Sequence, residues 1–189
     1  MLSPEHGLKL RRATATDCRL LWEWANDPIV RAAAFQTSPI AWHEHQSWFE
    51  QKLSASNCVI LIAEGSQGEP VGQIRFDWSA SASEVDVSVA KESRGRGHGA
   101  LLIRDGTVWF FREVRVSLVS AFVKSGNLTS ARAFERARYV CRERLPLHGV
   151  EVLRYVADKD SYAPSGTSQD HAPANTRPQD KNTSALLCL

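Results

Sequence analysis

Polar and apolar residues alternate between Ser83 and Val89, and this is the clearest pattern in the chain. Glu84, Asp86 and Ser88 fall on one side of an extended chain, whereas the residues between them are valines. A period of two residues predicts a strand with one buried face. A polar break at 91–93, a glycine-rich segment at 94–99 and an apolar run with helical spacing follow. The pattern therefore predicts a strand, a glycine-rich turn and a helix in direct succession.

Other stretches of the chain show either the period of two residues that is typical of strands or the spacing of apolar residues that is typical of helices. Upstream they predict a strand at 8–12, a helix from Thr14 or Thr16 to Ala25, a helical turn at 29–34, an amphipathic helix at 42–53, and strands at 58–63 and 71–78. Downstream they predict a helix at 97–112, a strand at 114–123, a helix at 130–138, and strands at 139–142 and 150–157.

The chain of 189 residues is long enough for one domain with a sizeable core. From Lys159 to Leu189 the composition shifts to Pro, Ser, Thr, Asn, Gln and Asp. Such a segment buries too little apolar surface to offset the entropy lost on ordering it. We therefore predict an N-terminal extension at 1–7, a domain at 8–158 and a disordered C-terminal tail at 159–189.

The composition narrows the class of protein. With 43% hydrophobic residues, 23% charged residues and a net charge of +2, the chain has no basic run interleaved with aromatic residues, so we expect no nucleic-acid partner. The four cysteines lie far apart without Cys-x-x-Cys spacing, so we expect neither a metal site nor a disulfide framework. No apolar run approaches the length of a membrane span, and residues 1–12 lack the apolar core of a signal peptide. These observations favour a cytoplasmic protein.

The glycine-rich turn has the chemistry of an anion site. Gly95, Gly97 and Gly99 leave the N–H groups at the start of the helix bare, and Arg94 and Arg96 add positive charge. The positive end of the helix dipole then faces a ligand such as a pyrophosphate. The turn lacks the Gly-Lys-Ser/Thr of a P-loop and the spacing of the dinucleotide-binding fingerprint. A tight surface turn with no ligand is the alternative.

The spacing Arg94-x-x-Gly97-x-Gly99, between a strand and a helix, resembles the acetyl-CoA motif of the GNAT superfamily of N-acetyltransferases. The order of elements over residues 8–158 is similar to that superfamily. So is a downstream motif formed by Ala121-x-Val123, Asn127-x-x-Ser130 and Phe134-Glu135. The resemblance implies an α/β (α+β) fold, with a mixed central sheet of six to seven strands and about four flanking helices. It also implies an enzyme that moves an acetyl group from acetyl-CoA to a primary amine by direct attack.

Two upstream motifs narrow the resemblance. They are Trp22-x-x-Ala25-Asn26-Asp27-Pro28-x-x-Arg31 and Glu44-His45-x-x-Trp48-Phe49. They look like the branch that holds ribosomal-protein acetyltransferases, and more closely like enzymes that N-acetylate a UDP-linked 4-amino-4,6-dideoxy sugar on the way to pseudaminic acid. This implies a small amine acceptor such as a nucleotide sugar, and a homodimer or a fusion or partnership with a sugar-nucleotide hydrolase. The alternatives are acetylation of a protein N-terminus and a non-catalytic CoA-binding module.

The resemblance assigns residues to the co-substrate acetyl-CoA. Backbone amides of the glycine-rich turn would hold the pyrophosphate, two valines would flank the pantetheine arm, and an asparagine would bond that arm. The residues expected to bind acetyl-CoA are Val89, Arg94, Gly95, Arg96, Gly97, His98, Gly99, Ala100, Val123, Asn127, Ser130 and Phe134.

Direct attack requires a base, because an amine arrives as ammonium. Glu84 is the first candidate, since in the family the polar face of this strand faces the acceptor. Asp86 lies two residues on, and two close carboxylates raise one another's pKa. Alternatively, Glu84 and Asp86 have no catalytic role and either face solvent or form ion pairs with arginine. His45 is a rival base; its alternative is a half-buried helix histidine under Trp48.

The general acid departs from the family pattern. In the family a tyrosine seven residues after the asparagine protonates the departing sulfur, but here that position is Phe134. Water or another hydroxyl, such as that of Ser130, would have to replace it. The Gly-Phe pair that ends the helix in the family is replaced by Arg138-Tyr139. We therefore expect an arginine in the left-handed cap position and Tyr139 in the core.

Overall fold

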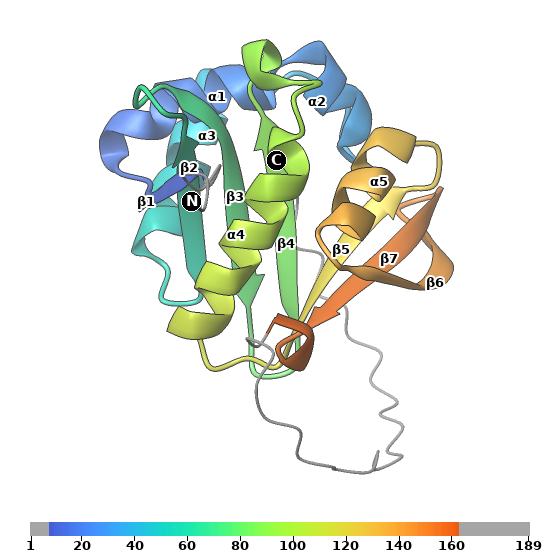
Figure 1. Cartoon of the computed structure of the whole chain (residues 1–189). Helices are drawn as coiled ribbons and strands as arrows, with labels where there is room; N and C mark the ends of the chain where they lie inside the picture. The colour runs from blue at the N-terminus through green and yellow to red at the C-terminus, as the bar shows by residue number, and fades with distance from the viewer. Residues whose placement is uncertain (1–7, 163–189) are drawn as a thin grey trace.

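The computed structural model describes residues 8–162 and contains a seven-stranded sheet with the strand order β1-β2-β3-β4-β5-β7-β6 (Figure 1). The strands are β1 (Lys9–Arg12), β2 (Cys58–Glu64), β3 (Pro70–Trp78), β4 (Ser83–Val89), β5 (Leu118–Lys124), β6 (Val140–Leu147) and β7 (Val150–Asp158). The α-helices are α1 (Cys18–Ala25), α2 (Pro28–Ala33), α3 (Trp42–Ser54), α4 (His98–Glu113) and α5 (Leu128–Arg136). The α/β fold with a mixed sheet is confirmed. The helical turn predicted at 29–34 is the additional helix α2, whose first residue is proline and whose N-cap is Asp27.

Each face of the sheet has its own apolar cluster. The larger cluster joins α4 and α5 to the sheet and includes Leu61, Ile74, Phe76 and Phe110. On the opposite face α1 and α3 pack on β2, where Leu21, Phe49, Ile60 and Ile62 are buried. The glycine in the middle of α4, Gly106, has a packing reason, because a Cβ there would lie 2.9 Å from the side chain of Ile74.

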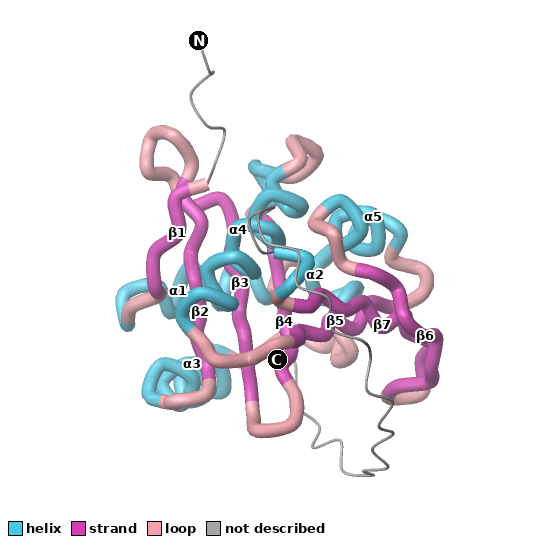
Figure 2. Tube along the Cα trace, turned by 60° about the horizontal axis from the view of Figure 1, so that its bottom comes forward, coloured by secondary structure: helices cyan, strands magenta, loops and turns pink. Residues whose placement is uncertain are grey.

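The sheet separates between β4 and β5. These two strands run parallel and pair at one register position, Glu84 opposite Ser120, whereas β3 and β4 pair along their whole length. Beyond Glu84 the strands diverge, and Figure 2 shows β5, β7 and β6 turning away from the first four strands. A parallel pair that opens in this way leaves unpaired backbone groups along both strands, where another extended chain can bind.

The predicted cap after α5 is confirmed. Arg138 adopts a left-handed conformation with φ of 67°, and its N–H donates to the carbonyl of Glu135. Tyr139 follows in the core with 3% exposure, and its hydroxyl lies 2.8 Å from that of Thr107. The strand predicted at 114–123 begins only at Leu118, because a backbone bond from Val116 to Val114 forms a turn there.

The predicted C-terminal boundary at Asp158 needs correction. Residues 160–162 form a 3₁₀ turn, and the Tyr162 ring lies 5.7 Å from that of Phe111 and 6.4 Å from that of Tyr139. The Tyr162 hydroxyl also donates to the carbonyl of Ala137. One aromatic residue in a polar stretch thus extends the packed domain to residue 162. The predicted extension at 1–7 and the rest of the predicted tail lie outside the described residues.

Candidate active site

A cleft opens where β4 and β5 diverge. Strand residues Val85, Val87, Ala121 and Val123 form its apolar floor. On one side lie α2 and the segment after it, through Val30, Arg31, Ala33, Ala34 and Phe35. On the other side lie Asn127, Ser130 and Phe134. The cleft therefore passes between the two halves of the sheet, with a different set of side chains at each end.

A strip of polar side chains lies on β3 and β4 at one end of the cleft. The register of this antiparallel pair places Gln73 opposite Ser88, Arg75 opposite Asp86 and Asp77 opposite Glu84. Residues directly opposite one another share a face of the sheet, so these six side chains form one continuous strip. The sequence analysis did not include Gln73 and Asp77 among the candidate site residues. Their positions, alternating with apolar residues along β3, could have indicated that they share a face with Arg75.

Asp77 holds the strip in place beneath α3. Its carboxylate accepts hydrogen bonds from Lys52 Nζ at 2.6 Å and from Arg75 Nε at 2.8 Å. Burial raises the pKa of Asp77, but Arg75 and Lys52 more than offset this and hold the pKa below its ordinary value. The guanidinium of Arg75 also lies over the Trp48 ring, 5.2 Å from its centroid. Arg75 is thus fixed from two directions where it lines the cleft.

The two candidate carboxylates occupy different depths. Asp86 lines the cleft, and its Oδ2 lies 3.4 Å from Gln73 Nε2. Glu84 lies at the closed end, opposite Ser120, where β4 and β5 still pair. Burial raises the pKa of Glu84, the facing carboxylate of Asp77 raises it further, and Arg75 and Arg154 oppose both effects. A carboxyl with a raised pKa is better suited to take a proton near neutral pH.

His45 is not brought to the cleft. It is 1% exposed, its ring stacks on Phe49 at 6.0 Å, and its Nε2 lies 3.1 Å from the carbonyl of Cys18. Burial lowers the pKa of His45. The ring therefore packs α3 against α1 and does not line the cleft, so the role of His45 is structural rather than that of a base.

The glycine-rich turn has the backbone geometry of an anion site. Gly95 and Gly97 have φ of 74° and 82°, and Gly97 is the N-cap of α4. The N–H groups of His98, Gly99 and Ala100, the first three residues of α4, have no carbonyl one turn before them. Within residues 8–162, Arg94 Nη1 and His98 Nδ1 are buried without a hydrogen-bond partner. Buried polar atoms are costly to leave unpaired, so these orphaned atoms fit an anion bound at the turn.

The remaining residues predicted to bind acetyl-CoA lie in the cleft, at the end of β4 and in the turn. Val89 is the last residue of β4, next to the Gly99 backbone. Asn127 caps α5 by accepting from the N–H of Ser130 at 3.1 Å, and both residues line the cleft. Phe134 is 3% exposed, with its ring 5.1 Å from that of Tyr139, and lines the same cleft. Arg96 is exposed in the turn.

Within residues 8–162 neither a metal-binding cluster nor a membrane-spanning helix is present. No group of three or more His, Cys, Asp or Glu side chains in this part of the chain is placed to hold a metal ion. Nor does this part contain a helix with the length and hydropathy needed to cross a membrane.

The chain matches a known family model and is similar in sequence to a known protein. A family model described as the acetyltransferase (GNAT) domain matches residues 7–140. The uncharacterized protein MJ1062 of Methanocaldococcus jannaschii is 29% identical over 133 residues, which are 67% of this chain and 26% of that protein. The chain thus spans about a quarter of this relative's length.

Solved structures show a similar fold. Spermidine N-acetyltransferase from Vibrio cholerae, in complex with CoA and spermine, superimposes with a TM-score of 0.75 at 17% identity, covering 84% of this chain and 99% of that one. The acetyltransferase AAC(6')-Ib, in complex with paromomycin and acetyl-CoA, gives a TM-score of 0.73 at 17% identity, covering 86% and 99%. At this level of identity the likeness concerns the fold.

Proposed function

This chain belongs to the acetyltransferase (GNAT) domain family, and on that premise we propose that it transfers an acetyl group from acetyl-CoA to the primary amine of a small molecule. The observation that carries the proposal is the cleft itself. It joins, in one space, the ends of β4 and β5, the capped start of α5 and the polar strip that includes Asp86 and Arg75. The donor and the acceptor would meet in the gap between the strands.

In this proposal acetyl-CoA enters along the diverging strands. Its pyrophosphate accepts hydrogen bonds from the N–H groups of the glycine-rich turn and the start of α4, and Arg96 adds positive charge. The pantetheine arm lies between Val89 and Val123 and bonds to Asn127, replacing strand-to-strand hydrogen bonds that β4 and β5 do not make. The thioester then reaches the region of Asp86.

The acceptor ammonium is bound by Asp86, which lines the cleft, and its proton passes to Glu84, whose pKa is raised. The free amine attacks the thioester carbonyl, the new carbon–nitrogen bond forms, the carbon–sulfur bond breaks, and the nitrogen gives up its second proton. Phe134 has no proton to give, so water or the Ser130 hydroxyl relays that second proton to the departing thiolate, and CoA leaves as the thiol. A thiol pKa of about 8.5 makes a dedicated acid helpful rather than obligatory.

A small acceptor is favoured by a contact over the cleft. Phe35, which lines the cleft, meets His148 of the β6–β7 hairpin with ring centroids 5.2 Å apart. This contact joins the segment after α2 to the other half of the sheet, and in this proposal it leaves less room for an extended polypeptide than for a small molecule. Within the small-molecule class we propose a UDP-linked 4-amino-4,6-dideoxy sugar. The resemblance of the α1–α2 and α3 motifs supports this choice, as do the cationic side chains of Arg75 and Lys124 at the cleft.

The resemblance also leads us to propose assembly as a homodimer or together with a sugar-nucleotide hydrolase. Acetylation of protein N-termini is the second candidate function, because the same motifs also resemble that branch.

The test is release of CoA thiol from acetyl-CoA with a panel of amines. The panel contains UDP-4-amino-4,6-dideoxy sugars, spermidine, kanamycin and peptides with free N-termini. We expect the amino-sugar nucleotide to give the highest kcat/KM and peptides to give none. Turnover of peptides alone would support the second candidate. CoA binding without turnover of any amine would indicate a CoA-binding module.

A further inference from the structure

The motif from Trp22 to Arg31 builds the wall of the cleft but has no part in the chemistry described above. Asn26 Oδ1 accepts from the N–H of Ile40 at 2.8 Å, and Trp22 Nε1 donates to the Ile40 carbonyl at 2.9 Å. These bonds tie the end of α1 to the segment that leads into α3. The motif therefore fixes the frame from which α2 projects.

Arg31 shapes the other end of this wall. It is 6% exposed, its Nε donates to the Ala25 carbonyl at 2.6 Å, and its Nη1 donates to the Gln36 carbonyl at 3.1 Å. One guanidinium thus joins the chain before α2 to the chain after it. Because Arg31 and Phe35 both line the cleft, the position of α2 decides the shape of the acceptor side.

Asp27 joins this wall to the glycine-rich turn. Its Oδ1 accepts from the N–H of Ile29 at 2.9 Å, as the N-cap of α2, and the same carboxylate pairs with Arg94 Nη2 at 2.9 Å. Arg94 Nε donates to the carbonyl of Val89, the last residue of β4, at 3.0 Å. One ion pair therefore connects the start of α2, the end of β4 and the turn.

The Asp27–Arg94 ion pair is largely buried, unlike an ion pair at the protein surface. The side chains are 15% exposed for Asp27 and 24% for Arg94. Burial raises the pKa of Asp27, but the bonds from Arg94 and from the Val30 and Ile29 N–H groups outweigh it and hold the pKa low. A half-buried charge held by several donors has few alternative positions, so a displacement of one partner is passed to the other.

We infer that the Asp27–Arg94 pair is a positioning contact, which couples binding of the CoA pyrophosphate at the glycine-rich turn to the position of α2 and so prepares the acceptor side of the cleft. The inference rests on the proposed function, since it requires CoA at this turn. The turn contains two glycines with positive φ, which have no side chains to hold its conformation, so a bound diphosphate orders it. Because Arg94 is paired with Asp27, ordering of the turn also restricts the position of α2. By thermodynamic linkage, the position of α2 then changes the affinity for CoA.

Hydrogen exchange of the full chain, with and without CoA, tests the coupling. In the wild type we expect CoA to slow exchange of the amides at 29–34 by about fivefold or more. Asp27→Asn keeps an oxygen to cap α2 but removes the charge. It should bind CoA ~3–10-fold more weakly and show no slowing in α2 at saturating CoA, while the turn at 95–101 is still protected. Arg94→Gln removes the pair from the other side and should give the same loss in α2.

Glu23→Gln is the matched control, because it removes the exposed Arg19–Glu23 pair of α1 and should retain the wild-type response. Equal slowing of α2 in wild type and Asp27→Asn would overturn the inference, as would CoA binding to the wild type with no slowing in α2. Calorimetric titration of the wild type with CoA separates the two claims. Absence of CoA binding would overturn the proposed function and this inference with it, whereas binding without coupling overturns only the inference.

Discussion

Glu84 and Asp77 stand directly opposite one another on β4 and β3, so two carboxylates share one end of the polar strip. Their environments separate them. Asp77 is held ionised by Lys52 and Arg75, while burial and the neighbouring Asp77 raise the pKa of Glu84. One carboxylate therefore fixes the site, and the other is free to take a proton.

Glu84→Gln should lower turnover and raise stability at neutral pH. The raised pKa means that the folded state binds the Glu84 proton more tightly than the unfolded state does. The stability this contributes is complete below the unfolded pKa of about 4.3 and is lost as pH rises through the folded pKa. The variant escapes this loss, so its melting temperature should exceed that of the wild type by roughly 1–3 °C at pH 7 and match it near pH 4. Turnover should fall ~10²–10⁴-fold.

Thermal melts from pH 4 to 8 and steady-state kinetics measure both effects. Glu113→Gln, which changes an exposed glutamate at the end of α4, is the control and should alter neither. Wild-type turnover in Glu84→Gln would assign the base elsewhere on the strip, first to Asp86.

Phe134→Tyr should raise turnover. The ring lines the cleft between Asn127 and the strands, so a phenol placed there can protonate the departing sulfur. General acid catalysis contributes ~10²–10⁴-fold, and an imperfectly placed acid should give a gain of about 3–10-fold in kcat. CoA affinity should stay within twofold or so, because the change acts on the leaving group.

Phe122→Tyr adds a phenol to another residue that lines the cleft and serves as the control for Phe134→Tyr. Its kcat should equal that of the wild type. An equal gain in both variants would show that added polarity, rather than a positioned acid, changes the rate.

The sequence predicted the elements of the fold because their periodicities are local. The alternation at 83–89 and the glycines after it correspond to β4 and the turn before α4. The pairing of β3 with β4 is not local, and only the register shows that Gln73 and Asp77 join Asp86 and Glu84 in one strip. Arg94 and Asp27 lie 67 positions apart in the sequence, so no motif contained their contact.

His45 is the opposite case, a residue that a sequence motif suggested for the site and that the fold places elsewhere. Its position in a motif suggested chemistry, but burial between α1 and α3 depends on how the two helices pack. Tyr162 shows the same limit at the other end of the domain. The polar composition of the sequence predicted disorder from residue 159, yet the Tyr162 ring packs against Phe111 and Tyr139.

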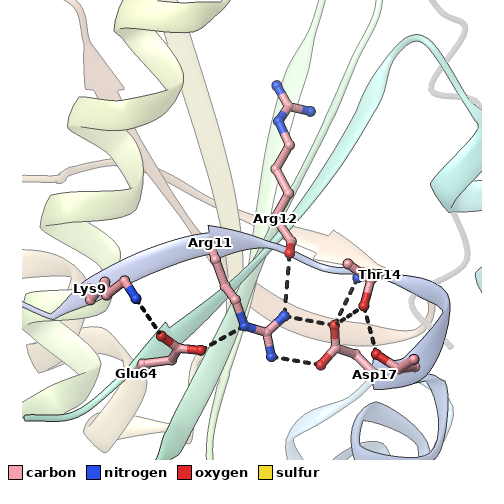
Figure 3. A network of polar contacts seen from close by, with 7 residues as sticks. Lys9, Arg11, Arg12, Thr14, Asp17 and Glu64 are labelled. Atoms are coloured by element: carbon pink, nitrogen blue, oxygen red, sulfur yellow. Dashed lines mark hydrogen bonds and ion pairs between the residues drawn. The ribbon is translucent and has the colours of Figure 1, made fainter. Parts of the chain in front are cut away.

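Asp17→Asn should destabilise the fold. Asp17 accepts two bonds from the guanidinium of Arg11, both at 2.8 Å, and one from the N–H of Thr14 at 2.8 Å (Figure 3). Its side chain is 7% exposed, so the neutral amide loses charge-assisted bonds that water does not replace. We expect a loss of about 1–3 kcal/mol in the free energy of unfolding at pH 7 by denaturant titration.

The same substitution has a pH signature. Hydrogen bonding to Arg11 lowers the pKa of Asp17, so its contribution is present above the unfolded pKa of about 3.9 and is lost as pH falls through the folded pKa. The gap between wild type and variant should therefore close in acid. Lys9→Gln is the control: it removes a pair in which Lys9 is 78% exposed and should cost less than ~0.5 kcal/mol. A gap that persists unchanged at low pH would show that packing, not charge, is the cause.

Tyr162→Ala should destabilise the domain by about 2–4 kcal/mol, because it removes a ring packed on Phe111 and Tyr139 and a hydrogen bond to the Ala137 carbonyl. Asp160→Ala, an exposed change in the same turn, should leave the melting temperature within about 1 °C. Equal melting temperatures for both variants would place the end of the stable domain at Asp158 after all.

Calorimetric titration with CoA of the wild type, Gly97→Glu and Gly68→Glu tests the central claim most directly. Gly97 and Gly68 have nearly the same φ, 82° and 80°, and a Cβ meets nothing within 4 Å at either, so the two substitutions carry similar backbone strain. Only Gly97 lies at the start of α4, where the proposal places the pyrophosphate. The account predicts CoA binding by the wild type and Gly68→Glu, and a loss of at least about a hundredfold in Gly97→Glu through charge repulsion. Unchanged CoA affinity in folded Gly97→Glu would contradict the assignment of the glycine-rich turn and of the cleft that it serves.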